Sequence, residues 1–66
     1  MKIELGKKYR GQVNGLEFEV IDTKTERDKV YGDTLMWRIG YEKDRIYQTE
    51  WHTNTFMEHL RIEEVK

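Results

Sequence analysis

The sequence predicts a mainly β fold: one small five-stranded antiparallel barrel or curled sheet, with one short helix at about 55–60 before the last strand. Two patterns of alternation predict the strands, and the length of the chain sets the size of the fold. Apolar and polar residues alternate on both sides of Asn14-Gly15, and they alternate again on both sides of a charged turn at 42–44. The 66 residues suffice for a single domain, 1–66, because so short a chain buries only about 60% of the surface of its unfolded form.

Asn14-Gly15 predicts a two-residue turn between strands at 7–13 and 16–23. Both central positions of such a turn need a positive φ, which Asn and Gly tolerate best. The turn would place apolar side chains on one face of the hairpin and opposite charges on the other. The pairs that it predicts are Val13 with Leu16, Tyr9 with Val20, and Arg10 with Glu19.

The next stretch, 23–33, is densely charged and predicts a solvated loop that ends in a turn at Gly32-Asp33. Alternatively, Val30 and Tyr31 extend a strand that pairs back with Thr34 and Leu35 across this turn. Strands are then expected at 34–41 and 45–51. A three-residue turn at 42–44 joins them, with Asp44 in the left-handed conformation. This register gathers most apolar side chains of the two strands on one face, namely Leu35, Trp37, Ile39, Tyr41, Tyr47 and Trp51. The side chains expected on the opposite face are Met36, Arg38 and Ile46.

A short helix is expected at about 55–60, because Thr55 followed by Glu58 matches a capping box. Phe56 and Leu60 lie four residues apart and should both face the core. Alternation resumes at 60–65 and predicts a short last strand.

Several segments resemble a known group of proteins. Gly6-Lys7-Lys8-Tyr9-Arg10 leads into Gly15–Ile21, and Tyr47-x-Thr49 and Thr55-Phe56-x-x-x-Leu60 follow. These segments are similar to short uncharacterised proteins of bacteria and their phages that are built as SH3-like (Tudor-like) barrels. The resemblance covers most of the chain and implies a barrel fold in a bacterial or phage context. It includes no motif that is diagnostic of a function, and one such fold hosts many functions.

Composition favours some functional classes over others. The chain has 12 basic and 13 acidic side chains, a net charge of −1, and no cysteine. Such a balance disfavours a dedicated nucleic-acid-binding protein, which usually has a basic surface. The sequence has no long apolar run, so we expect a cytoplasmic protein without a membrane segment.

Catalytic and metal-binding motifs are not evident. Serine and cysteine nucleophiles are missing, and the five glycines are too scattered for a phosphate-binding loop. His52 and His59, with Glu50 and Glu58 nearby, could bind zinc, but their spacing matches no zinc motif. We therefore expect no enzyme, no cofactor and no metal.

Aromatic residues outnumber the needs of a small core, and those near strand ends are candidates for partner binding. The predicted partner-binding residues are Tyr31, Met36, Arg38, Arg45, Trp51 and His52. They favour a non-enzymatic protein-interaction module, such as a phage or prophage regulator or inhibitor of a host protein. The alternatives are a small-barrel nucleic-acid-binding protein and a homo-oligomeric structural protein. The chain could also form a homodimer.

Overall fold

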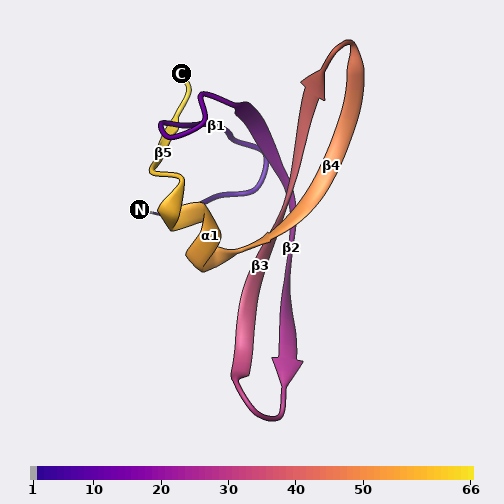
Figure 1. Ribbon diagram of the computed structural model, residues 1–66, viewed down its shortest axis with the longest axis vertical. Coiled ribbons are helices and arrows are strands. Elements are labelled where there is room, and N and C mark those ends of the chain that lie inside the picture. Colours follow the sequence, from indigo (N-terminus) through magenta and orange to yellow (C-terminus); the bar gives the residue numbers. More distant parts are fainter. Residues whose placement is uncertain (1) are drawn as a thin grey trace.

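The computed structural model describes residues 2–66, which form one antiparallel sheet of five strands and one short helix (Figure 1). The strand order is β4-β3-β2-β1-β5, so the sheet does not close and β4 and β5 are its edges. The mainly β fold with a helix before the last strand is confirmed, in the form of an open, twisted sheet. The elements are β1 (Lys8–Gly11), β2 (Glu17–Asp28), β3 (Gly32–Lys43), β4 (Ile46–Thr53), α1 (Asn54–His59) and β5 (Ile62–Glu64).

The β1–β2 turn lies where it was expected, but the predicted register is wrong by two residues. Tyr9 lies opposite Phe18, and Arg10 lies opposite Glu17 and pairs with its carboxylate. Gly15 alone has a positive φ in this turn. Val13 is 68% exposed and belongs to a loop whose backbone N–H groups donate to the carbonyls of the α1–β5 corner. An even shift keeps each side chain on its predicted face, so Tyr9 and Phe18 still point inward.

The charged stretch 23–33 is not a loop, and this prediction is wrong. It forms the outer end of a long hairpin, because β2 continues to Asp28 and β3 begins at Gly32. The turn is therefore at 29–31, before Gly32-Asp33. Residues 25–35, in which 25–28 pair with 32–35 on either side of the turn, are called the arm below, and they project beyond the rest of the sheet, as Figure 1 shows at the bottom.

The β3–β4 turn has two residues, and the three-residue prediction is wrong. Asp44 and Arg45 both have positive φ, at 53° and 65°, and Lys43 lies opposite Ile46. Asp44 does take the expected left-handed conformation. The register moves by three residues, an odd number, so the β4 side chains change faces. Trp51 therefore lies opposite Arg38, on the face away from the core.

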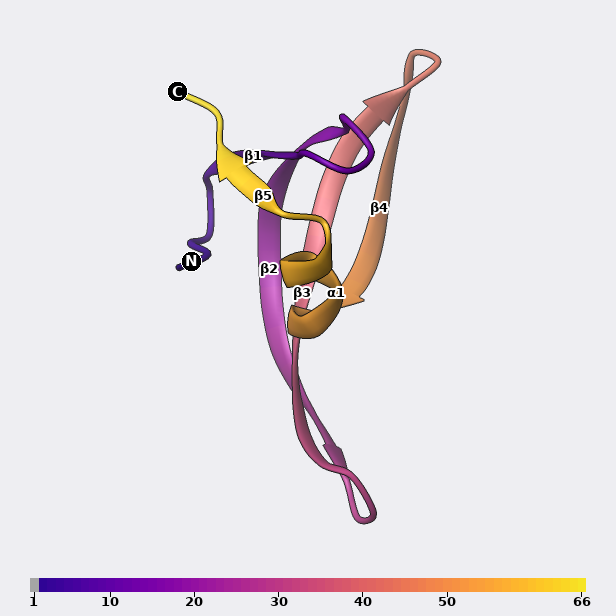
Figure 2. The same cartoon turned by 60° about the vertical axis from the view of Figure 1, so that its left-hand side comes forward.

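The core lies between the inner face of the sheet and α1, which Figure 2 shows beside β3 and β4. Thr53, not Thr55, caps the helix, because its Oγ1 accepts a hydrogen bond from the backbone N–H of Phe56. Phe56 is 43% exposed, so its predicted burial is wrong, and Trp37 is only partly buried. The buried residues are Tyr9, Phe18, Val20, Ile39, Tyr41, Met57, Leu60 and Ile62.

Residues 2–66 include no helix with the length and apolar character needed to cross a membrane.

Candidate protein-binding site

The face of β2, β3 and β4 that points away from the core has a compact group of exposed and half-buried side chains. Cross-strand register brings these side chains together: Lys24 lies opposite Met36, and Arg38 lies opposite Trp51. Three of them, Met36, Arg38 and Trp51, were predicted to bind a partner. Lys24 was missed because its segment was expected to be a loop. We call Lys24, Met36, Arg38 and Trp51 the outer cluster.

The indole of Trp51 is at the centre of the outer cluster. The Nζ of Lys24 lies 4.4 Å from the ring centroid, and the guanidinium carbon of Arg38 lies 6.0 Å from it. Cations at these distances are attracted to the face of the ring and limit the freedom of all three side chains. A tryptophan held in this way presents a large contact area at a low entropic cost, as binding hot spots do.

One of the two positive charges of the outer cluster is paired with a neighbouring carboxylate. Lys24 forms an ion pair with Glu26 at 3.0 Å, and Asp22 lies opposite Arg38. Arg38 also donates from Nη2 to the Thr49 hydroxyl at 3.1 Å. The surface is therefore mixed in charge rather than strongly basic.

The tip of the arm presents two large apolar side chains. Val30 is 80% exposed and Tyr31 is 87% exposed. The turn that holds them has a defined structure, because the Asp28 carboxylate accepts hydrogen bonds from the backbone N–H groups of both residues at 2.7 and 3.0 Å. These bonds lower the pKa of Asp28, the bond from Tyr31 having the larger effect.

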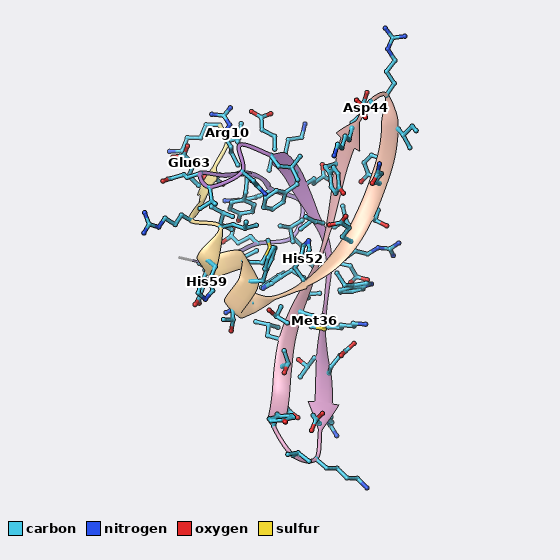
Figure 3. All side chains as sticks on the ribbon, in the orientation of Figure 1. Arg10, Met36, Asp44, His52, His59 and Glu63 are labelled. Atoms are coloured by element: carbon cyan, nitrogen blue, oxygen red, sulfur yellow. The ribbon has the colours of Figure 1, made fainter. Side chains whose placement is uncertain are left out.

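The remaining predicted residues lie apart from the outer cluster. Figure 3 shows Met36 near the base of the arm and Asp44, next to Arg45, at the opposite end of the molecule. Arg45 and Tyr31 therefore occupy opposite ends of a molecule that is 39 Å long. His52 lies opposite Trp37 on the inner face and stacks on Phe56, with ring centroids 4.5 Å apart. The structure thus brings three of the six predicted residues together and separates the other three.

A hydrogen-bonded chain of titratable groups crosses the inner face between β3 and β4. The Tyr41 hydroxyl donates to Glu50 at 2.6 Å, and His52 Nε2 lies 3.0 Å from the other Glu50 oxygen. The bond from Tyr41, followed by the contact with His52, lowers the pKa of Glu50, while the same carboxylate raises the pKa of Tyr41.

Replacing Glu50 by glutamine is expected to reduce the acid sensitivity of the fold. Because the pKa of Glu50 is depressed in the folded state, its contribution to stability is present above the ordinary value of 4.5 and is lost as the pH falls through the depressed value. Urea unfolding of wild type and E50Q from neutral pH down to about pH 3 measures this effect. The matched control is E42Q on the same hairpin. Equal acid sensitivity in wild type and E50Q would contradict the assignment.

No three His, Cys, Asp or Glu side chains in the part of the chain that the structure describes gather as a metal site would require. The comparisons with known proteins add no assignment: no family model, curated protein or solved structure matches this chain.

Proposed function

We propose that this chain is a non-enzymatic protein-interaction module, a small regulator or inhibitor that holds another protein with the outer cluster and the arm. The observation that supports this most is the arm itself. A two-stranded ribbon is marginally stable alone, and this one has Val30 and Tyr31 exposed at its tip. A partner protein that covers the tip would bury both side chains and stabilise the ribbon.

The chemistry of the outer cluster favours a protein over a nucleic acid. Phosphate backbones attract uncompensated cations, whereas Glu26 neutralises Lys24 here and Asp22 lies opposite Arg38. Trp51 adds a large amphipathic ring of the type that dominates protein interfaces. The expected partner surface is apolar at its centre and mixed in charge at its rim.

Trp51→Ala is expected to abolish capture of the partner without unfolding the chain, because Trp51 is on the face away from the core. Immobilised wild type, W51A and a control are compared for the proteins that each captures from bacterial lysate, the source that the sequence resemblance favours. The control is F56A, which removes a 43% exposed aromatic ring elsewhere on the molecule. A protein bound by wild type and F56A but lost with W51A supports the proposal.

The same experiment, repeated after nuclease treatment, separates the two candidate functions. A protein partner remains after nuclease treatment, whereas capture through nucleic acid is lost. Direct titration with labelled single-stranded and duplex DNA and RNA at low salt completes the test. Tight binding that weakens steeply with added salt would replace the protein-binding proposal with the nucleic-acid alternative. Identical capture by all three variants would also contradict the proposal.

A further inference from the structure

β4 is a long edge strand with a free outer side. It has eight residues, and no other strand within residues 2–66 pairs with that side. The opposite edge, β5, has only three residues, two of them glutamates. Short, charged edges resist pairing with another chain, whereas long, weakly charged edges invite it. β4 is therefore the edge that is suited to add a further strand.

β4 also lacks most of the usual features that prevent edge pairing. It contains no lysine or proline, and its pairing with β3 shows no bulge. Its one carboxylate, Glu50, points to the inner face, where it accepts a hydrogen bond from Tyr41 and contacts His52. The edge itself is left open to an incoming strand.

The pattern of backbone hydrogen bonds between β3 and β4 identifies which backbone groups of β4 are free. Lys43 and Ile46 flank a two-residue turn and so form a hydrogen-bonded pair. Hydrogen-bonded and non-hydrogen-bonded pairs alternate along an antiparallel ladder. Tyr47, Thr49 and Trp51 therefore direct their backbone N–H and C=O groups toward the free edge.

We propose that this edge joins two copies of the chain, β4 against β4, around a two-fold axis at Thr49. Thr49 then lies opposite its own copy, and Tyr47 lies opposite Trp51 on both sides of the axis. All three residues with free backbone groups meet in this register, as an antiparallel ladder requires. The match is self-complementary, which a two-fold interface demands.

The side chains distinguish this register from its neighbours. With the axis at Thr49, the two aromatic pairs share the outer face, and Glu50 lies opposite the neutral Gln48. Cross-strand aromatic pairs are favourable. An axis at Glu50 would instead place two carboxylates opposite each other, which is destabilising.

Dimerisation would make the outer faces of the two copies continuous. The strand order would run β5-β1-β2-β3-β4 and then through the second copy in reverse, with each Trp51 beside the partner copy. Because the two β4 strands are antiparallel, the two arms would point in opposite directions. This inference goes beyond the proposed function, which concerns a different partner and does not require a dimer.

The test places charges on the two-fold axis. A single strand pair makes a small interface, so wild type is expected to be monomeric at about 1 μM and dimeric at about 100 μM in sedimentation experiments. T49K and T49E each place like charges opposite each other and should raise the dissociation constant about tenfold or more. An equimolar mixture of T49K and T49E should form a heterodimer, which also shows that both variants are folded.

T25K is the matched control, because Thr25 is an exposed strand threonine of the arm, far from the β4 edge. It should dimerise like wild type. A wild-type chain that stays monomeric at about 100 μM would overturn the proposal. Equal dimerisation of T49K and wild type, or equal dissociation of T25K and T49K, would overturn it as well.

Discussion

Replacing Ile39 by alanine is expected to remove a large share of the free energy of unfolding. Ile39 is 1% exposed and lies opposite Val20, which is fully buried. Removal of three carbons from such a site costs about 2–5 kcal/mol, since the lost burial and the cavity add. A domain of 66 residues has about 3–10 kcal/mol of total stability, so this loss is a large share of it.

Urea unfolding followed by circular dichroism measures the effect of I39A. Leu35→Ala is the matched control, because Leu35 lies on the same strand but belongs to the arm and is 42% exposed. Its loss should cost less than about 1 kcal/mol. Equal destabilisation by I39A and L35A would show that the core extends into the arm, contrary to the structure.

The first hairpin shows what local sequence can predict. Asn14-Gly15 correctly placed the turn, and strand alternation placed Tyr9 and Phe18 on the buried face. The register was missed because it depends on residues distant in the sequence. The N–H groups of Gln12 and Val13 donate to carbonyls of the α1–β5 corner, which opens the turn into a longer loop.

The arm was missed for a different reason. Alternation reveals a strand when one face is buried, and neither face of the arm is. Its pairing depends on the cross-strand ladder between β2 and β3. The β-branched residues Thr23 and Thr25 were a local signal for a strand on the β2 side, and the surrounding charges concealed it.

The candidate site depends on an odd register shift that no local signal predicted. The sequence favoured a turn at 42–44 because that register gathered the apolar side chains on one face, whereas the turn formed needs a left-handed Arg45, which is uncommon. The actual two-residue turn moved Trp51 to the outer face, where it joins Arg38. Met36 and Arg38 were correctly expected on that face. Ile46 was also expected on that face, but it lies opposite Lys43 and so points to the inner face. The composition of the site could thus be predicted in part, but its assembly required the β3–β4 register.

Shortening the arm is expected to abolish capture of the partner protein while leaving the fold intact. Glu26 lies opposite Thr34, so an Asn-Gly turn can replace residues 27–33 and join the two paired positions. The replacement removes Val30 and Tyr31, the exposed side chains of the tip. The free energy of unfolding should change by less than about 1 kcal/mol, because no residue of the arm belongs to the core.

This truncation also separates the two interfaces. It leaves Thr49 and the β4 edge unchanged, so self-association in sedimentation experiments should equal that of wild type. Capture from bacterial lysate should fall to the level of W51A, because the arm and the outer cluster are proposed to hold the same partner. A truncated chain that is folded and still captures that partner would show that the arm tip has no part in binding. The exposure of Val30 and Tyr31 would then need another cause, and the outer cluster would have to hold the partner alone.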